Sequence, residues 1–151
     1  MVERLKEVGE IIKLSKPHTS LPKVEPPHKK VTVKTSSTLS QNGIANENIL
    51  DLNLFTSWNA DEIDENPWIE LDFGQKETFN YFSMHAGYKK SIQKYKIEVF
   101  LKNKWVHLFT GGPATFHEKH PFKEVKAQKF RLQVLENKGI PEIVELTFVK
   151  Y

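Results

Sequence analysis

Apolar side chains in the first part of the chain recur at helical spacing. Within residues 1–14, Leu5, Val8 and Ile12 lie about one turn apart and charged residues fill the positions between them, which predicts an amphipathic helix. Residues 15–30 follow with four prolines, and they are predicted to form an extended linker because proline lacks the amide hydrogen that a helix needs. A helix this short is marginal in water, so its apolar stripe is expected to pack against the domain that follows or against a part that this chain does not contain.

From residue 31 onward the apolar positions alternate with a period of two. In "WIELDFG" (residues 68–74) the apolar residues face one way and the acidic residues the other, and the final glycine ends the run. Residues 94–109 alternate on both sides of a Lys-Asn-Lys turn, and residues 129–135 and 144–151 alternate again. Short alternating strands separated by polar turns predict that residues 31–151 form an all-β domain, a sandwich or a barrel.

The three tryptophans are the largest side chains available to the core. Trp68 and Trp105 lie within strand patterns, so both are expected in the core. Trp58 is expected to pack in the core or at its rim rather than to stack on a ligand.

Composition and charge remove several classes of function. The chain has no cysteine, which excludes disulfides and thiolate metal sites. The formal net charge is +3, but the positive charges are lysines spread along the chain, and the only arginines are Arg4 and Arg131. Nucleic-acid binding is therefore not expected, because it requires a basic patch. No apolar run approaches the length of a membrane span, so membrane insertion is not expected.

Oxygen-bearing side chains interrupt one apolar run, "NILDLNLFTSWN" (residues 48–59). Asp51, Asn53 and Thr56 lie within five residues of one another, and carboxylate, amide and hydroxyl oxygens are ligands that calcium accepts in flexible geometry. The pattern favours a calcium ion that holds the loop. The alternative is that Asp51 and Asn53 form Asx turns and Thr56 bonds to the backbone without any ion.

The same residues begin an ordered set that resembles a known family. After Asp51, Asn53, Thr56 and Trp58, the chain continues with "PWIELDFG", "TFNYF", "IQKYKIEVF" with Trp105, "KFRLQVL" and "PEIVEL". This order is similar to that of discoidin domains, also called coagulation factor V/VIII type C domains, whose sugar-binding members are the family 32 carbohydrate-binding modules. The resemblance covers residues 31–151. It implies a galactose-binding-like jelly-roll β-sandwich with ligand loops at one end.

The resemblance also implies how the calcium loop is closed. In similar modules a structural calcium lies at this loop, and a glutamate near the C-terminus, which corresponds to Glu145, completes the site. The family pattern has glycine after the aspartate, whereas this chain has Leu52. A leucine tolerates positive φ poorly, so this position is a departure from the pattern.

Loop residues between the strands are the candidates for sugar binding, because sugars are held by an aromatic face and polar side chains in a shallow cleft. The candidates are His85, Tyr88 and Lys89 after one strand, Phe116 and His117 in a Gly/Pro-flanked loop, and Asn59 after the calcium loop. These residues also have structural interpretations without a ligand. His85 would simply end a strand, Lys89 would belong to a solvated turn, and Phe116 would cover the edge of the core.

Catalysis finds little support in the sequence. The acidic loop "DEIDE" (residues 61–65) contains enough carboxylates for a glycosidase pair, but crowded acids in a polar loop are usually a solvated surface. His117 and His120 in "HEKH" have a spacing that zinc sites use, yet they lie in a loop and lack the HExxH register. We therefore expect that this chain is not an enzyme by itself.

The N-terminal segment suggests the context of the module. "ERLKEVGEIIKLSK" resembles the last helix of the catalytic barrel in family 29 α-L-fucosidases, several of which carry a discoidin-type module at the C-terminus. The resemblance implies a module for galactose- or fucose-containing glycans, attached to a parent catalytic domain and extracytoplasmic, either periplasmic or secreted. Two alternatives remain: a discoidin-type module that binds protein or lipid through Phe116, Lys89 and Lys90, and a purely structural accessory domain.

Overall fold

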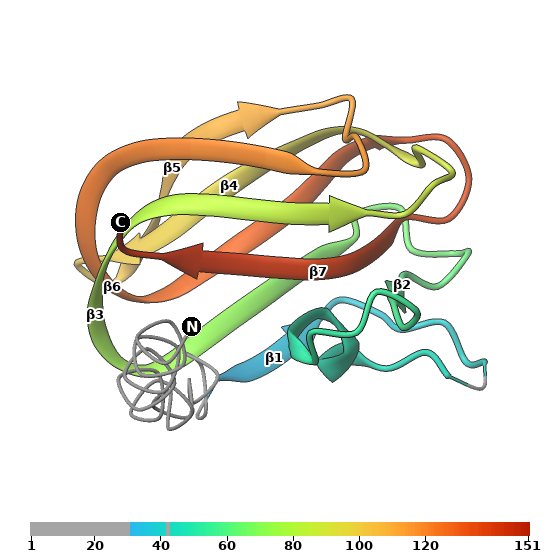
Figure 1. Ribbon diagram of the computed structural model, residues 1–151, viewed down its shortest axis with the longest axis horizontal. Helices are drawn as coiled ribbons and strands as arrows, with labels where there is room; N and C mark the ends of the chain where they lie inside the picture. The colour runs from blue at the N-terminus through green and yellow to red at the C-terminus, as the bar shows by residue number, and fades with distance from the viewer. Residues whose placement is uncertain (1–30, 42) are drawn as a thin grey trace, which may run out of the picture.

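The computed structural model describes residues 31–41 and 43–151, which form seven strands and one short 3-10 helix (Figure 1). The predicted helix and linker lie outside the described residues. The elements are β1 (Thr32–Thr35), η2 (Asn46–Leu50), β2 (Trp58–Asn59), β3 (Trp68–Ala86), β4 (Ile92–Leu101), β5 (Lys104–Gly111), β6 (Glu118–Asn137) and β7 (Glu142–Val149). The all-β class is therefore confirmed. A search of the same residues finds no helix that is long and apolar enough to cross a membrane.

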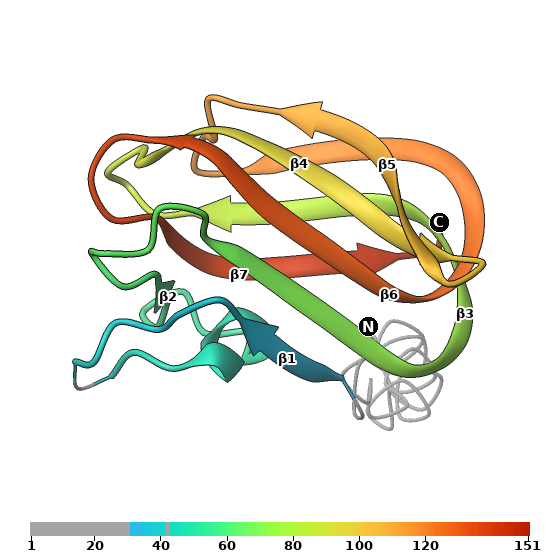
Figure 2. The same cartoon turned by 180° about the vertical axis from the view of Figure 1, so that it is seen from behind.

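Two long strands, β3 and β6, pass through both layers of a sandwich (Figures 1 and 2). The first part of β3 pairs antiparallel with β1 and with the last part of β6, which in turn pairs with β4, and β4 with β5. The second part of β3 pairs with the first part of β6 and with β7, and β7 pairs with β2. The register of β3 against β6 shifts between Asp72 and Glu77, where both strands bend from one layer to the other.

The prediction that a strand ends at Gly74 was wrong. Gly74 adopts φ 78° inside β3, a left-handed conformation that glycine enters without steric cost. The amide of Gly74 donates a hydrogen bond to Asp72 Oδ1 at 2.8 Å. The glycine therefore bends the strand instead of ending it.

The core lies between the two layers and is rich in aromatic rings. Tyr95, Ile97 and Val99 are fully buried, as the alternation in β4 predicts. Across the layers, the rings of Phe130 on β6 and Phe148 on β7 stack with centroids 4.2 Å apart. Burial of these side chains is the main source of stability for a fold of this kind.

The three tryptophans divide between the core and the surface. Trp58 is fully buried, and its indole nitrogen donates a hydrogen bond to the carbonyl oxygen of Ser37 at 3.0 Å. The prediction that Trp105 and Trp68 lie in the core was wrong, because both are only partly buried and lie outside the core cluster. Trp105 pairs with Phe100 in the register of β4 against β5, and Phe100 follows the inward-facing Val99, so both rings lie on the outer face.

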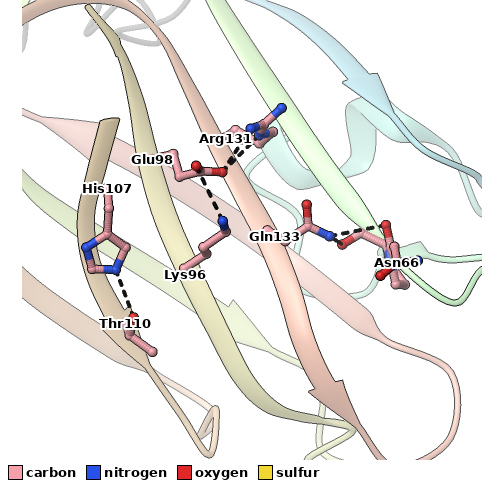
Figure 3. Close-up of polar contacts among 8 residues, drawn as sticks. Asn66, Lys96, Glu98, His107, Thr110, Arg131 and Gln133 are labelled. Carbon is pink, nitrogen blue, oxygen red and sulfur yellow. Dashed lines mark hydrogen bonds and ion pairs between the residues drawn. The ribbon is translucent and has the colours of Figure 1, made fainter. Parts of the chain in front are cut away.

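Charged side chains cover that outer face (Figure 3). The guanidinium of Arg131 lies 4.3 Å from the centroid of the Trp105 ring and donates two hydrogen bonds, of 3.0 and 3.1 Å, to Glu98 Oε1. Lys96 lies on the other side of the carboxylate, with its Nζ 3.5 Å from Glu98 Oε2. The arginine thus shields a tryptophan that the strand pattern turns outward.

The connections place two groups of segments at opposite ends of the sandwich (Figures 1 and 2). The segments after β1, β2, β3, β5 and β6 lie at one end, which we call the loop end. The β4–β5 hairpin and the bends of β3 and β6 lie at the other end. In the hairpin, Lys102 and Asn103 have φ of 50° and 63°, which is typical of a two-residue turn. The predicted Lys102 to Lys104 turn is one residue longer than the observed one, because Lys104 already belongs to β5.

Candidate functional site

The Asp51 turn and the last strand meet, as the family resemblance implies. The amide of Asn53 donates hydrogen bonds to Asp51 Oδ1 at 2.9 Å and to Glu145 Oε1 at 3.1 Å. The hydroxyl of Thr56 lies 2.5 Å from Asp51 Oδ2 and 3.0 Å from the carbonyl oxygen of Asn53. Asp51, Asn53, Thr56 and Glu145 therefore form one group, which we call the Asp51–Glu145 cluster.

The two carboxyl groups of the cluster influence each other's pKa. Glu145 is 6% exposed; burial, the hydrogen bond to Asp51 and the negative charge of Asp51 raise its pKa to about 8. Burial also acts to raise the pKa of Asp51, but hydrogen bonds from Thr56 and Asn53 outweigh it and lower this pKa. At neutral pH Asp51 is therefore ionised and Glu145 retains a proton.

The donor set fits calcium better than a transition metal. Within residues 31–41 and 43–151, no group of three or more His, Cys, Asp or Glu side chains is placed to hold a metal. Any ion at the Asp51–Glu145 cluster would therefore take most of its ligands from amide, hydroxyl and backbone oxygens, which calcium accepts. The ion-free alternative also has support, because the amides of Asn53 and Phe55 close Asx turns on Asp51 and Asn53. Leu52 has φ 57°, which is the conformation that glycine would adopt without strain.

The raised pKa of Glu145 predicts a pH dependence of stability in calcium-free buffer. The folded chain retains the Glu145 proton up to about pH 8, whereas the unfolded chain releases it near the ordinary glutamate pKa. The folded state thus binds more protons between about pH 5 and pH 8, so its stability falls as pH rises through this range. In EDTA, we expect the melting temperature of Glu145→Gln to fall less between these pH values than that of the wild type. Identical pH profiles would show that Glu145 does not carry this proton.

Four of the predicted sugar-binding residues form an aromatic cluster at the loop end. His85, at the end of β3, stacks on His117 with ring centroids 4.3 Å apart and meets Phe116 edge-on at 5.1 Å. Tyr88, which is 85% exposed, stacks on Phe116 at 5.0 Å. Burial, together with the neighbouring His85 and Lys119, lowers the pKa of His117, so its ring is neutral at neutral pH. His85 Nδ1 is buried and has no hydrogen-bond partner in the described part of the chain.

The other two predicted residues, Asn59 and Lys89, line a separate pocket of about 310 Å³ at the same end, which we call the loop pocket. Its walls come from the segments after β1, β3 and β6, from the end of β2 and from the start of β7. The pocket is lined by Leu39, Gln41, Ile44, Asn59, Lys89, Ser91, Lys138, Gly139, Ile140 and Glu142. Since Tyr88 and Lys89 are consecutive, the loop pocket and the aromatic cluster share the segment after β3.

Sequence reasoning missed most of the polar side chains of the loop pocket. Ser91, Lys138 and Glu142 come from two segments that are far apart in the chain, and the fold ties them together. The amide of Lys138 donates a hydrogen bond to the carbonyl oxygen of Ser91 at 2.7 Å, and the amide of Glu142 donates one to Ser91 Oγ at 3.2 Å. The Asn-Lys-Gly turn signal at residues 137–139 indicates a loop there, but not which loop it faces.

The acidic loop and the second histidine have structural contacts. Asp64 Oδ2 accepts hydrogen bonds from the hydroxyls of Ser36 and Ser37 at 2.5 and 2.6 Å. Burial acts to raise the pKa of Asp64, but these hydrogen bonds outweigh it and lower the pKa. His120 contacts the Tyr95 hydroxyl at 3.1 Å, while His117 stacks on His85. The two histidines of HEKH therefore contact different residues and do not form a pair.

Comparisons with known proteins agree with the fold. The family model of the F5/8 type C domain matches residues 32–146. A family 32 module of Clostridium perfringens GH89, solved with GalNAc-β-1,3-galactose, has a TM-score of 0.73 and 20% identity over 82% of this chain and 98% of its own. The family 32 module of C. perfringens NanJ, solved with galactose, has a TM-score of 0.72 and 15% identity over 82% of this chain and 96% of its own.

A larger protein also contains a similar module. The Ruminococcus gnavus GH29 fucosidase, solved with fucose, has a TM-score of 0.72 and 23% identity over 98% of this chain, which spans 30% of the fucosidase. No curated protein sequence matches the chain. At these identities the similarity shows the fold, and it confirms the predicted galactose-binding-like β-sandwich.

Proposed function

The chain belongs to the F5/8 type C (discoidin) domain family, and from this premise we propose that it is a non-catalytic carbohydrate-binding module for galactose- or fucose-containing glycans. Domains of this family are typically non-catalytic, and modules of this fold have been solved with galactose-type sugars. The proposal therefore assigns binding, and not bond cleavage, to this chain.

The loop pocket is the observation that carries the proposal. Its volume of about 310 Å³ is at the lower end of the range for small-molecule sites. Asn59, Lys89 and Glu142 offer hydrogen-bond donors and acceptors for sugar hydroxyls, and Leu39, Ile44 and Ile140 offer apolar contact. Binding of a single sugar in such a site is expected to be weak, because few contacts offset the loss of freedom on association.

The aromatic cluster extends the loop pocket. Tyr88 presents an exposed ring stacked on Phe116, so it can pack against the apolar face of a second sugar unit. We assign His85 and His117 to support of this platform, because their rings stack on each other and His85 meets Phe116. The predicted residues thus act as two adjacent parts of one surface.

The same proposal includes a structural calcium ion at the Asp51–Glu145 cluster. Asp51, Asn53, Thr56 and Glu145 would hold it, with backbone oxygens of the turn. The ion would supply positive charge that neutralises the two carboxylates. Because Glu145 lies on β7 and Asp51 follows η2, this interaction would fix the first loop against the last strand.

We also assign the module to a parent glycoside hydrolase, an α-L-fucosidase, outside the cytoplasm. The support is the resemblance of residues 3–16 to the end of a fucosidase barrel and the similarity of 98% of this chain to part of the R. gnavus fucosidase. The task of the module would be to hold the parent catalytic domain near its glycan substrate.

A glycan array followed by titration tests the sugar proposal. We expect binding to galactose- or fucose-terminated glycans, competition by the free sugar, and a loss of about tenfold or more in affinity for Lys89→Ala and Asn59→Ala, since each removes a polar contact. Lys123→Ala is the matched control, because Lys123 is exposed on β6 and does not line the loop pocket. Absence of binding to every sugar would contradict the proposal.

A second candidate function rests on the loop beside the Asp51–Glu145 cluster. Phe55 is fully exposed, and Leu52 and Leu54 next to it are largely exposed. Exposed apolar residues of this kind favour the protein- or lipid-binding type of discoidin domain. Sedimentation with anionic liposomes that is abolished by Phe55→Ser, together with a blank glycan array, would favour this alternative.

A further inference from the structure

A second pocket lies at the end of the sandwich opposite to the loop end; Figures 1 and 2 show the hairpin and the strand bends at that end. Its volume is about 650 Å³, and it lies between the β4–β5 hairpin and the bends of β3 and β6. We call it the lysine pocket, because its lining includes Lys76, Lys102, Lys126 and Lys129 together with Phe100 and Gln128.

Positive charge in the lysine pocket is only partly compensated. Lys129 Nζ lies 3.8 Å from Asp72 Oδ2. The same carboxylate also accepts a hydrogen bond from Gln128. Among residues 31–41 and 43–151, Lys76, Lys102 and Lys126 have no ion pair within 4.0 Å. No acidic residue lines the pocket. The four lysines of its lining carry more positive charge than the formal net charge of the whole chain, which is +3, so positive charge is concentrated here. Like charges gathered around one hollow repel each other unless an anion enters.

The backbone fixes where these lysines lie. Lys102 occupies a left-handed position, φ 50°, in the two-residue hairpin turn. Lys76 follows Gly74 at the bend of β3, and Lys126 and Lys129 belong to β6 where it crosses between layers. The hairpin turn, β3 and β6 thus each contribute lysines to the lining of one pocket, which distinguishes the pocket from a run of lysines along a single solvated strand.

The lysine pocket also has an aromatic wall. The ring of Phe100 lines it, held edge-on by Trp105 at 5.2 Å, and the Nζ of Lys129 lies 5.6 Å from the Phe100 ring centroid. A cation beside an aromatic ring suits a ligand that combines a negative group with apolar C–H surface. A sugar ring that carries an acidic group has both features.

We propose that the lysine pocket binds an anionic saccharide, one that carries a sulfate or carboxylate group. A membrane headgroup fits less well, because none of the exposed large apolar side chains lines the pocket and membrane association requires apolar residues that insert. A nucleic acid fits less well too, because the lining contains no arginine for bidentate phosphate contacts. The proposal does not require the loop pocket to bind a neutral sugar, and it gives the module a second contact on an acidic glycan.

Amide-resolved NMR titration tests the proposal with three matched probes: a galacturonate trisaccharide, a sulfated galactose trisaccharide and neutral galactotriose. We expect the acidic probes to shift the amides of Lys102, Asn103 and Lys129, and the neutral probe to leave them unchanged. Lys102→Ala/Lys126→Ala should weaken acidic-probe binding about tenfold, and 0.5 M NaCl should weaken it further, because salt screens exposed charges. Both lysines are exposed, so an unchanged melting temperature verifies the fold.

Lys138→Ala is the matched control, because Lys138 lines the loop pocket and not the lysine pocket. Lys138→Ala should leave the shifts that the acidic probes cause at the hairpin amides intact, even where it weakens binding at the loop pocket, so failure of this proposal is distinguishable from failure of the loop pocket. The proposal is overturned if the hairpin amides do not shift, or if the neutral probe shifts them equally. It is also overturned if phosphatidylserine vesicles, but not the saccharides, bind in a manner that requires Lys102 and Lys126.

Discussion

Removal of calcium with EDTA at pH 8 is expected to lower the melting temperature of the protein by about 10 °C. In the folded chain Asp51 and Glu145 lie together and are bridged by the Asn53 amide, whereas the unfolded chain separates them. An ion that binds only the folded state at about a hundred times its dissociation constant adds about 2.7 kcal/mol, and a domain of this size shifts by about 4 °C per kcal/mol.

Variants of the Asp51–Glu145 cluster identify the source of this effect. Asp51→Asn and Glu145→Gln should lose the calcium response, while Glu62→Gln, which removes an exposed acid elsewhere, should keep it. The calcium shift should also be smaller at pH 6 than at pH 8, because the Glu145 pKa of about 8 makes calcium compete with a proton. Differential scanning calorimetry measures each shift. Equal melting temperatures with and without chelator, and no metal in the purified protein, would contradict the calcium assignment.

Replacement of Arg131 by methionine is expected to destabilise the protein by about 2–3 kcal/mol. The change removes the two hydrogen bonds to Glu98, whose side chain is only 9% exposed, and leaves that carboxylate with Lys96 alone (Figure 3). A buried charge that loses its partner pays its desolvation cost without compensation. The guanidinium contact with the Trp105 ring is lost as well.

Urea unfolding of a double-mutant cycle tests this prediction. Arg131→Met combined with Glu98→Leu should recover much of the lost free energy, since the unpaired carboxylate is then absent. Lys96→Met is the control and should cost less than about 1 kcal/mol, because the lysine is more exposed and makes a longer contact. If Arg131→Met costs no more than this control, the ion pair contributes little to the fold.

Local patterns predicted the strands but not how they continue. The alternation of Tyr95, Ile97 and Val99 indicates which face of β4 is buried, because a period of two is a property of a single strand. The course of β3 through Gly74 could not be read in the same way. A glycine with positive φ ends some strands and bends others, and the bend here depends on pairing with β6, which lies some fifty residues further along the chain.

Trp105 and Leu52 show two different limits of a sequence pattern. Trp105 fits the alternating pattern of its strand, but its side chain points to the outer face of the sheet. There the guanidinium of Arg131, from another strand, covers the ring. Leu52 occupies the position that the family pattern gives to glycine, and it has a positive φ. The family pattern thus indicated the backbone conformation of this turn even though the residue differs. The pattern therefore identified the turn.

Candidate site residues were predictable one loop at a time. His85 and Tyr88 were selected in one segment and Phe116 and His117 in another, and the structure brings the two pairs into one cluster. Lys138 and Glu142 were missed because their role depends on which loop they face, and that arrangement is set by strand order. The lysine pocket was missed for the same reason, since its lysines look evenly spread along the sequence.

Amide-resolved NMR titration with a galactose- or fucose-terminated oligosaccharide tests the central claim most directly. The sugar should shift the backbone amides around the loop pocket, with the largest changes at Lys89, Ser91, Lys138 and Gly139, and the hairpin at the opposite end should stay unchanged. Shifts confined to other surfaces, or no shifts at millimolar sugar for any glycan that contains galactose or fucose, would contradict the assignment of the loop pocket as the glycan-binding site.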